Sequence, residues 1–453
     1  MMTTFRDEAL IKKYNVKGPR YTSYPTALLL RSGFAPERAL QALADTGPAL
    51  SLYLHVPFCR ELCYYCGCNK VISRDQSKAD RYLDALATEM ALYQSACAAK
   101  QVHQLHFGGG TPTYLDEAQL RRLMQLLHQH FQFLPEAELS IEIDPRSCDV
   151  EKLRLLRELG FSRVSFGVQD FDLQVQQTIN RIQPYSMVET LVNAARELQF
   201  RSVNLDLVYG LPHQATETFS QTLAQVVTLD PDRVSLFSYA HLPERFAAQR
   251  KIPDAALPGA TEKLGLLALA MDHLQQAGFV AIGMDHFAKA SDPLTKAQQA
   301  HQLTRNFQGY SVDACDALLG LGVSAISQVG NVIWQQQKEL KHYYQALEQQ
   351  QKLAIDKGLT LSRDDQIRAD LIARIMCNFV LDSAALAQQW QINFQDYFAG
   401  SLAQLAPCLD DGLVRWQGDV LEVTERGRPW VRIIAAAFDA YLLGQQQSYS
   451  KVI

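Results

Sequence analysis

Apolar, strand-like runs alternate with helical segments from about residue 51 onward, and this alternation restricts the fold more than any other feature. The helical segments lie at 79–96, 117–130, 150–159, 186–198, 216–228 and 261–277. The strand-like runs lie at 52–58, 104–107, 139–143, 163–168, 202–208, 233–239 and 279–283. Such alternation predicts six or seven βα units on a parallel sheet. Because eight units cannot be counted, we expect an α/β partial (βα) barrel, with its chemistry at the C-terminal ends of the strands.

The two ends of the chain depart from this pattern and predict a three-part organisation. Residues 18–25 read Gly-Pro-Arg-Tyr-Thr-Ser-Tyr-Pro and show no helical period, which indicates an extended arm. We assign residues 1–48 to an N-terminal arm over the active site, 49–334 to the catalytic partial barrel and 335–453 to a mainly helical C-terminal domain.

Within the C-terminal domain, residues 334–352 predict an exposed helix. Further helices are expected at 364–379, 381–390 and 394–405, with a small hairpin over 412–424. Helices followed by a hairpin resemble a winged helix, but a helical lid on the barrel is favoured, because a fold-level likeness carries no function by itself.

Composition excludes several classes of function. The chain of 453 residues is 47% hydrophobic and has a formal net charge of −5, which gives no general attraction to nucleic acid or anionic lipid. No run approaches the ~18 apolar residues of a membrane span, and the polar first seven residues lack the apolar segment of a secretory signal. We expect a cytoplasmic protein that binds neither nucleic acid nor membrane, and a monomer in the absence of a leucine-rich seam.

Four of the nine cysteines fall in one short run, Cys59-Arg-Glu-Leu-Cys63-Tyr-Tyr-Cys66-Gly-Cys68. An odd number of cysteines in a long chain favours a reducing compartment with one metal or cluster site over a disulfide framework. Thiolates at spacings of four and three residues, on a loop after a strand, can converge on one iron–sulfur cluster.

Two alternatives to this interpretation are a structural zinc and a ferredoxin-type cluster. Cys63 and Cys66 could form one zinc-binding pair, but no second C-x2-C or matching histidine pair follows. The bacterial ferredoxin run uses two-residue gaps, which this motif does not match. Cys68 could be a fourth cluster ligand, but the single-residue spacing from Cys66 is awkward for binding two different irons, so we do not assign it as a ligand.

Glycines and polar side chains follow successive predicted strands. Any one of them is equally consistent with a hydrogen-bonded structural group, but together they predict a site at one edge of the sheet. A carboxylate inside an apolar strand, such as Asp206, is costly unless it is hydrogen-bonded or functional. In chain order the set comprises Gly108-Gly109-Gly110-Thr111-Pro112, Glu142, Asp144, Gln169, Asp170, Asp206, Tyr239 and His241.

The C-x3-C-x2-C spacing resembles the motif of the radical S-adenosylmethionine (SAM) enzymes. That superfamily binds three irons of a [4Fe-4S] cluster through three cysteines and leaves the fourth iron open for SAM. Over nearly its whole length, the chain is similar to the family of bacterial oxygen-independent coproporphyrinogen III oxidases, or coproporphyrinogen dehydrogenases. The similarity rests on residues 18–27, 53–59, 63–70, 106–113, 206–212, 283–288, 305–310 and 319–327.

The resemblance implies a set of site residues. Cys59, Cys63 and Cys66 would bind one [4Fe-4S] cluster, and two SAM molecules would share the site. The first SAM would contact Tyr53, Tyr65, Gly109, Glu142 and Ile326. The second would contact Gly110, Thr111, Gln169, Arg181, Asp206 and Ala240. Position 65 often carries Phe in this family, so Tyr65 adds a hydroxyl that needs a partner if buried.

The resemblance also implies a reaction, the oxidative decarboxylation of two propionate side chains of coproporphyrinogen III to vinyl groups, giving protoporphyrinogen IX for haem biosynthesis. A 5′-deoxyadenosyl radical from SAM would begin it, with electrons from a low-potential donor such as flavodoxin or ferredoxin. Tyr53, Arg20 and Arg305 are the candidate catalytic residues, and the two arginines suit the substrate carboxylates. A haem-binding chaperone and a haem-degrading methyltransferase of the same superfamily are the alternatives, and a cluster-containing nucleic-acid regulator is disfavoured by the acidic balance.

Overall fold

A computed structural model describes residues 7–14, 16, 18–312 and 315–442, and its contacts divide the chain into two compact units. One unit comprises residues 30–259 and 315–360 and is called the sheet unit here. The other comprises residues 1–29, 260–314 and 361–453 and is called the helical unit. The units interleave along the chain, whereas the sequence predicts three consecutive segments. The reason is local: residues 317–321 form a strand that pairs with residues 50–54 of the sheet unit.

The core of the sheet unit is a run of six parallel strands, each hydrogen-bonded to the next. This arrangement confirms the predicted partial barrel and six of its expected strands. Their interiors alternate buried apolar residues with more exposed positions, so one face packs against helices and the other is left for polar side chains. The strands are β2 (Ala49–Val56), β5 (Gln101–Gly109), β6 (Gln132–Ile143), β7 (Arg163–Gln169), β8 (Ser202–Tyr209) and β9 (Arg233–Ser238).

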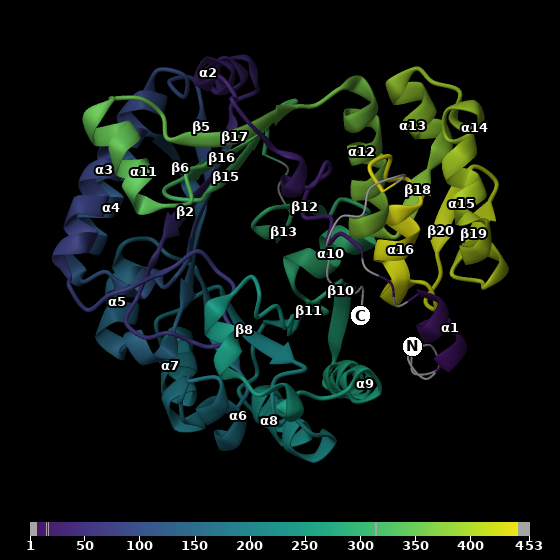
Figure 1. Ribbon diagram of the computed structural model, residues 1–453, viewed down its shortest axis with the longest axis horizontal. Helices are drawn as coiled ribbons and strands as arrows, with labels where there is room; N and C mark the ends of the chain where they lie inside the picture. Colours follow the sequence, from purple (N-terminus) through teal and green to yellow (C-terminus); the bar gives the residue numbers. More distant parts are fainter. Residues whose placement is uncertain (1–6, 15, 17, 313–314, 443–453) are drawn as a thin grey trace. The chain divides into compact units, whose positions relative to one another are not determined.

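Helices connect these strands and lie along one side of them, as Figure 1 shows for α3, α4, α5 and α7. The helices predicted at 117–130 and 216–228 are found at those positions, and the others agree within about two residues. No helix among the described residues is both long and apolar enough to cross a membrane. The helices are α2 (Pro36–Asp45), α3 (Ser77–Gln94), α4 (Glu117–His130), α5 (Val150–Glu158), α6 (Leu173–Thr178), α7 (Tyr185–Glu197) and α8 (Thr216–Thr228).

Residues 315–360 return to the other side of β2 and correct one prediction. β14 (Ala317–Leu321) pairs with β2 in parallel, and β15, β16, β17 and β1 extend the sheet in antiparallel fashion. The exposed helix expected at 334–352 is therefore wrong at its start, because Trp334 is fully buried in β16. The elements are β15 (Ile326–Val329), β16 (Val332–Gln336), α11 (Leu340–Tyr344), a π-helical turn (Gln345–Gln349), β17 (Ile355–Thr360) and β1 (Arg31–Ser32).

The seventh expected strand is found at its predicted residues, 279–283, which fall within the helical unit. β10 (Phe279–Gly283) forms an antiparallel hairpin with β11 (His286–Lys289). The apolar run Phe-Val-Ala-Ile-Gly predicts a strand but does not determine its partner. Two further short strands, β12 (Thr304–Asn306) and β13 (Gly309–Ser311), pair antiparallel in the same unit.

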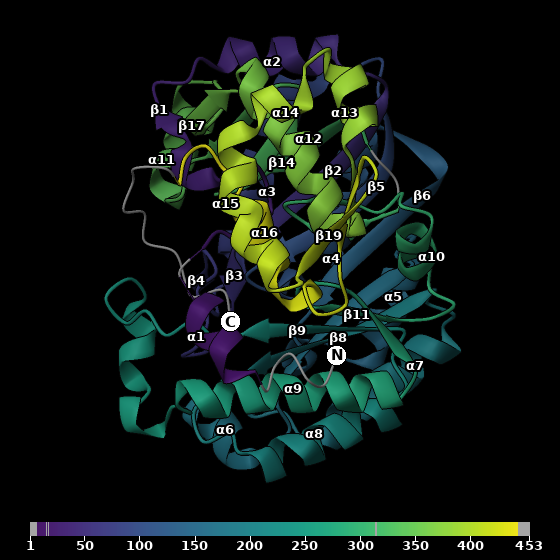
Figure 2. The same ribbon diagram turned by 90° about the vertical axis from the view of Figure 1, so that its right-hand side faces the viewer.

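The predicted C-terminal helices and hairpin are present in the helical unit, and Figure 2 shows α12, α13, α15 and α16 grouped together. A Ser362 capping box starts α12, and its apolar face enters one buried core with the C-terminal helices. The elements are α1 (Glu8–Tyr14), α9 (Ala260–Gln276), α10 (Pro293–Gln299), α12 (Arg363–Asn378), β18 (Val380–Asp382), α13 (Ser383–Trp390), α14 (Phe394–Tyr397), α15 (Ala399–Asp410), β19 (Val414–Gln417), β20 (Val420–Val423) and α16 (Val431–Ala436).

The segment predicted to be an extended arm packs on this helical core. Arg432 on α16 donates from Nε to the carbonyl of Pro19 at 2.9 Å, and the Tyr21 hydroxyl donates to Asp439 at 2.9 Å. Tyr21 and Tyr24 are both buried in the core of the unit. Side chains rather than a regular ladder therefore hold the arm, which explains why it lacks a periodic pattern.

Candidate active site

The cysteine motif lies on a loop between the end of β2 and α3. Phe58 and Cys59 form a short strand, β3, that pairs in parallel with β4 (Val71–Ile72) and closes the loop at its base. Two hydrogen bonds join the loop to the segment after α6: Tyr64 N–H donates to the Ile179 carbonyl at 2.9 Å, and the Asn180 side chain donates from Nδ2 to the Leu62 carbonyl at 2.9 Å. The loop is thereby fixed at both its base and its tip.

The thiols of this loop are all free, and two of them touch cationic or hydroxyl groups. Cys59 Sγ lies 3.3 Å from Thr111 Oγ1. Cys63 is buried and accepts from Arg146 Nη2 at 3.2 Å and from Arg181 Nη1 at 3.5 Å. Two guanidinium groups therefore place positive charge against this buried sulfur.

Cys66 and Cys68 lie side by side at the exposed end of the loop. The backbone N–H of Cys68 donates to Cys66 Sγ at 3.5 Å, and Lys70 Nζ donates to the Cys66 carbonyl at 2.8 Å. The hydrogen bond from the Cys68 thiol, together with the charge of Lys70, lowers the pKa of Cys66 to about 6. Cys68 thus supports the thiolate of its neighbour in this arrangement.

The glycine run after β5 lies against the start of the cysteine loop. A Cβ at Gly110 would lie 2.6 Å from the carbonyl oxygen of Pro57, and a Cβ at Gly109 would lie 2.7 Å from the His55 ring. Gly109 also has φ +115°, a backbone conformation that favours glycine. The spacing of the two strand ends therefore requires glycine here, as the motif indicated.

Tyr53, His106 and Glu142 form one group on the polar face of β2, β5 and β6. The rings of Tyr53 and His106 stack at 5.9 Å between centroids, and His106 Nε2 lies 3.4 Å from Glu142 Oε1. Gly109 N–H donates to Glu142 Oε2 at 3.2 Å. Desolvation acts against the charged carboxylate, but these hydrogen bonds outweigh it and hold the pKa of Glu142 below its ordinary value.

Gln169 ends β7, and Arg181 lies in the segment after α6. Arg181 Nη2 donates to the carbonyl of Gly167 at 2.7 Å, two residues before Gln169. Gln169 has φ +62°, an uncommon conformation for this residue type. Among the described residues, the buried Gln169 Oε1 and Arg181 Nε have no hydrogen-bond partner. A bound polar ligand could form hydrogen bonds with buried atoms of this kind.

Asp206 lies on β8, beside Gly167 of β7 in the sheet register. Ser165 Oγ donates to its Oδ2 at 2.8 Å, and Asn204 Nδ2 donates to its Oδ1 at 2.8 Å. Desolvation raises the pKa of Asp206 to about 6, because its hydrogen-bond partners are neutral. The carboxylate predicted from the sequence is thus hydrogen-bonded but carries no ion pair in the described residues.

Asp144 has a different environment at the end of β6. Its Oδ2 lies 2.7 Å from Arg146 Nη2 and 3.0 Å from Arg181 Nη1, and all three side chains are 15% exposed or less. Burial opposes ionisation, but the two guanidinium groups lower the pKa of Asp144 to about 2. Because both arginines also touch Cys63, this carboxylate fixes their position at the cysteine loop.

The remaining predicted contacts, Tyr65, Ala240 and Ile326, lie around this core. Gln249 Nε2 donates to the carbonyls of both Tyr65 and Ala240, at 3.0 and 3.2 Å. Ile326 begins β15, and its carbonyl lies close to Gly320, the residue that pairs with Tyr53. The structure therefore brings all the residues predicted for the cluster and for SAM into one unit.

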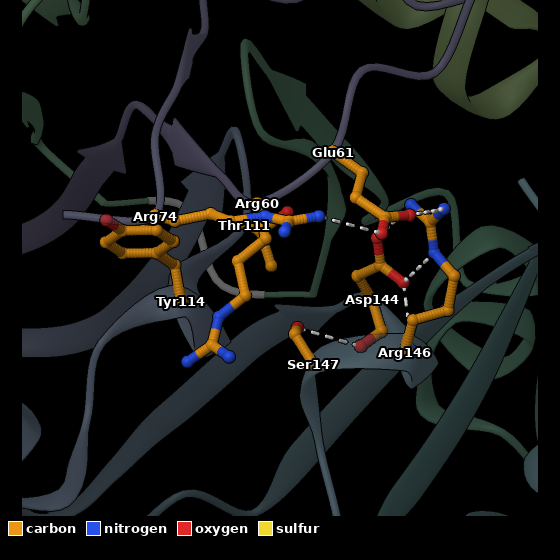
Figure 3. Close-up of a pocket in the computed structure, with 8 residues that line it drawn as sticks. All are labelled: Arg60, Glu61, Arg74, Thr111, Tyr114, Asp144, Arg146 and Ser147. Atoms are coloured by element: carbon orange, nitrogen blue, oxygen red, sulfur yellow. Dashed lines mark hydrogen bonds and ion pairs between the residues drawn. The ribbon is translucent and has the colours of Figure 1, made fainter. Parts of the chain in front are cut away.

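A pocket of about 420 Å³ opens beside the cysteine loop. Figure 3 shows Glu61, Asp144 and Arg146 together on one side of it, across from Tyr114. Its lining is rich in arginine, and Thr111 and Arg146 reach from it to the thiols of Cys59 and Cys63. The lining residues are Arg60, Glu61, Arg74, Thr111, Tyr114, Asp144, Arg146 and Ser147.

Arg20 and Arg305, the two predicted substrate contacts, both belong to the helical unit. Arg20 Nη1 lies 3.4 Å from Asp285 Oδ2. Arg305 lies over the ring of Tyr310, with 4.7 Å from its Cζ to the ring centroid, and its buried Nε has no partner among the described residues. Arg305 thus keeps a donor free for a further ligand.

Sequence reasoning missed His106, Arg146, Ser165, Asn204 and Gln249. Two pairs of strand residues in the site are separated by two positions: Asn204 and Asp206 on β8, and Ser165 and Gly167 on β7. Residues two apart on a strand share a face, so polar residues alternating within apolar strands were the signal for Ser165 and Asn204. Gln249 lies in a short 3-10 helix after β9, and no pattern in the sequence marks it.

The residues of this unit fit an iron–sulfur cluster and a SAM-like ligand. Three thiols stand on one loop with arginine and lysine donors beside them. In the described residues, no three His, Cys, Asp or Glu side chains surround one metal-ion position, whereas a cluster takes its thiolates on separate irons. The glycine edge of β5 and the unpaired atoms of Gln169 and Arg181 offer polar contacts to a second ligand.

Comparison with protein families defines the class to which this fold and site belong. The family described as "Radical SAM superfamily" matches residues 53–226, which include the cysteine loop and most of the parallel strands. The "HemN C-terminal domain" matches residues 361–430 in the helical unit. The predicted class, a radical SAM protein with a partial (βα) barrel, is therefore confirmed.

Individual relatives narrow the class to one family. The chain is 51% identical over 450 residues to the oxygen-independent coproporphyrinogen III oxidase of Escherichia coli, covering 99% of this chain and 98% of the relative. The corresponding protein of Pseudomonas aeruginosa is 46% identical over 461 residues, the full length of both chains. A solved structure of the E. coli oxidase, described as a radical SAM enzyme, matches with a TM-score of 0.93 over 96% of this chain and 99% of that chain. This chain belongs to the family of oxygen-independent coproporphyrinogen III oxidases.

Proposed function

We propose that this protein converts coproporphyrinogen III to protoporphyrinogen IX without oxygen, by oxidative decarboxylation of two propionate side chains to vinyl groups. Each decarboxylation releases one CO₂ from the substrate, transfers one hydrogen atom to a 5′-deoxyadenosyl radical and passes one electron to a one-electron acceptor. The observation that carries the proposal is a three-thiol loop at the end of β2, in a chain about half identical to named oxidases over nearly its full length. The loop is needed for this argument because membership of a fold family does not by itself determine what a site does.

We assign Cys59, Cys63 and Cys66 as ligands of one [4Fe-4S] cluster, and two SAM molecules to the adjoining polar face. The cluster and SAM supply the one-electron chemistry that removes a hydrogen atom from the substrate. The chain supplies position. Tyr53, Tyr65, Gly109, Glu142 and Ile326 are proposed for the first SAM, and Gly110, Thr111, Gln169, Arg181, Asp206 and Ala240 for the second.

Several local features support these assignments. Arg181 and Gln169 present buried unpaired atoms to the second proposed site, and such atoms favour a polar ligand. The Tyr53 hydroxyl lies 3.2 Å from His55 Nδ1, whose ring also contacts the Asn69 carbonyl in the cysteine loop at 2.9 Å. Tyr53 is therefore held by a residue that also orders the loop, which suits a group that positions ligands.

We propose Arg20 and Arg305 as anchors for the substrate carboxylates. The free Nε of Arg305 supports the second assignment. Arg20 stands in the extended arm, which we propose shields the reaction from solvent. The arm at 1–48, the barrel at 49–334 and the helical domain at 335–453 remain the proposed functional divisions.

We further propose a cytoplasmic, monomeric enzyme that matters most when oxygen is scarce, because an exposed iron–sulfur centre needs protection from oxidation. A low-potential electron donor such as flavodoxin or ferredoxin would reduce it. Neither a membrane nor a nucleic acid is a proposed partner, consistent with the net charge of −5.

A single anaerobic assay tests the reaction. Protein reconstituted with iron and sulfide is given coproporphyrinogen III, SAM and a low-potential reductant. We expect protoporphyrinogen IX and two equivalents of CO₂ per substrate. In a parallel reaction that contains haem in place of coproporphyrinogen III, haem binding without turnover would favour the chaperone alternative, and a methylated or ring-opened haem product would favour the methyltransferase.

A further inference from the structure

The exposed large apolar side chains described in the sheet unit lie on elements that contact the cysteine loop. Among the residues that the structure describes, this unit exposes three large apolar side chains, Ile72, Leu173 and Ile182, at 42%, 57% and 54%. Ile72 pairs with Cys59 in the short ladder that closes the loop. Ile182 follows Arg181, which touches Cys63, and Leu173 begins α6, directly after which Ile179 accepts from Tyr64 of the loop. Exposed apolar side chains on the elements that hold the loop indicate an interaction surface there.

The pocket beside the loop carries an excess of positive charge. Three arginines, Arg60, Arg74 and Arg146, line the pocket beside the loop, against the two carboxylates of Glu61 and Asp144. Arg74 is 82% exposed and lies 3.9 Å from Glu61. Arg60 is exposed and makes no ion pair in the part of the chain that is described. Its charge is available to an acidic partner.

This face is also in direct contact with the thiols. Arg60 follows Cys59 in the chain, Thr111 Oγ1 lies 3.3 Å from Cys59 Sγ, and Arg146 Nη2 lies 3.2 Å from Cys63 Sγ. The rate of electron transfer falls steeply with distance, so a carrier bound here would have a short path to the site. An apolar centre with a charged rim is also the usual anatomy of a protein–protein interface.

We propose that this face, formed by Arg60, Arg74, Ile72, Leu173 and Ile182, is the docking surface for an acidic one-electron carrier protein. The proposal rests on the proposed function, because it assumes a redox centre at the cysteine loop. The carrier gives up one electron and the site gains one, with no bond made or broken. The positive charge selects an acidic carrier, and the apolar residues hold it close for the transfer.

Charge reversal with two reductants tests this assignment. The reconstituted holoenzyme is reduced either by flavodoxin hydroquinone, an acidic protein, or by dithionite, a small ion that needs no docking face. For R60E/R74E, we expect the rate of SAM cleavage with flavodoxin to fall about 10- to 100-fold, as for electrostatically steered association. With dithionite, the rate should stay within twofold of the wild-type rate. The flavodoxin rate of the wild type should also fall as salt is added.

A binding measurement gives a readout that does not depend on turnover. Oxidised flavodoxin is titrated with the holoenzyme, and its dissociation constant should rise about tenfold or more in R60E/R74E. The matched control is R154E/R201E, which makes the same charge change on exposed arginines of the sheet unit. Arg154 lies on α5, and Arg201 precedes β8 at the opposite end of the strands from the cysteine loop. This control should bind like the wild type.

The outcomes separate cleanly. Equal losses in R60E/R74E and R154E/R201E would mean that general charge, not this face, attracts the carrier, and would overturn the proposal. Equal losses with flavodoxin and dithionite would show that Arg60 or Arg74 acts on the redox centre itself, and would overturn it as well. SAM cleavage and flavodoxin binding need no porphyrinogen, so a wrong substrate assignment would leave this test intact.

Discussion

Two carboxylates of the site, Asp144 and Asp206, show how neighbours decide the state of chemically identical groups. Both follow or lie within parallel strands of the same sheet, at β6 and β8. Asp144 lies between two guanidinium groups and has a pKa of about 2, whereas Asp206 accepts only from neutral groups and has a pKa of about 6. Asp144 is therefore ionised throughout the physiological pH range, whereas Asp206 binds and releases its proton close to that range.

The different environments of Asp144 and Asp206 suit different chemical roles. A cluster-binding loop needs a fixed positive environment. The two ion pairs of Asp144 hold Arg146 and Arg181 against Cys63. Asp206 keeps a carboxylate close to its titration range, which suits a group that hydrogen-bonds a polar ligand. Substitutions on each side test this difference between the two carboxylates, beginning with Cys63, the thiol that both arginines contact.

Cys63→Ser should have the largest effect of all. We expect loss of the brown cluster absorbance and of SAM cleavage after anaerobic reconstitution, because one of three thiolates is removed from the proposed site. The matched control is Cys68→Ser, which should retain most of the chromophore. Loss of the cluster in Cys68→Ser would mean that this residue is a ligand and that our assignment of it is incorrect.

Asp144→Asn should destabilise the sheet unit. The substitution leaves Arg146 and Arg181 buried without their shared carboxylate, and breaking a buried ion pair in this way costs about 3–5 kcal/mol. Urea unfolding of the protein followed by circular dichroism measures the change. The exposed pair of Arg121 and Glu158 supplies the control, since Glu158→Gln should cost less than about 1 kcal/mol. Similar losses in the two variants would show that Asp144 contributes no more than a surface carboxylate.

The contrast between these regions also shows what can be predicted from sequence. Helical periodicity located α4 and α8 at their observed limits, because each connects two strands across one apolar face. The pairing of β10 and the burial of Trp334 escaped prediction, because local pattern identifies a strand but not its partner. The interleaving of the two units likewise depends on which distant strand adds beside β2.

Site residues divide in the same way. The cysteines and glycines carry a recognisable spacing, so they could be selected from the sequence with Asp206. Arg181 could not be placed beside Cys63 from its pattern, because its ion pair with Asp144 exists only once the end of β6 and the segment after β7 meet. Arg146 is only two residues from Asp144, but its contact with Cys63 depends on the fold. Arg181 was selected by resemblance alone, and Arg146 was missed. Ionic networks formed between distant segments leave no periodic trace in the chain.

Arg305 is a further guanidinium with a different environment. Its substitution is expected to have the next largest effect on activity. Arg305 has an aromatic neighbour, Tyr310, and a free Nε, and unlike Arg181 it has no carboxylate partner among the described residues. If that donor binds a substrate carboxylate, Arg305→Ala should raise the KM for coproporphyrinogen III about 10- to 100-fold, the value of one charged hydrogen bond. Arg20→Ala should act in the same direction, and Arg305→Lys should recover part of the loss. Unchanged kinetics in either alanine variant would remove that arginine from the proposed substrate contacts.

The smallest effect expected is a change in how stability depends on pH. Asp206 binds a proton more tightly in the folded protein than in the unfolded chain, since desolvation raises its pKa from an ordinary 3.8 to about 6. Its contribution to the free energy of unfolding must therefore fall as pH rises from about 4 to about 6. Asp144, with a lowered pKa, contributes the opposite slope below about pH 4. Asp206→Asn should gain about 1–2 kcal/mol relative to wild type between pH 4 and pH 6.5, after allowance for partial exposure. Urea unfolding at each pH measures the difference in free energy of unfolding between the variant and the wild type. If that difference is constant across the range, Asp206 does not titrate there and does not differ from Asp144 in the way described.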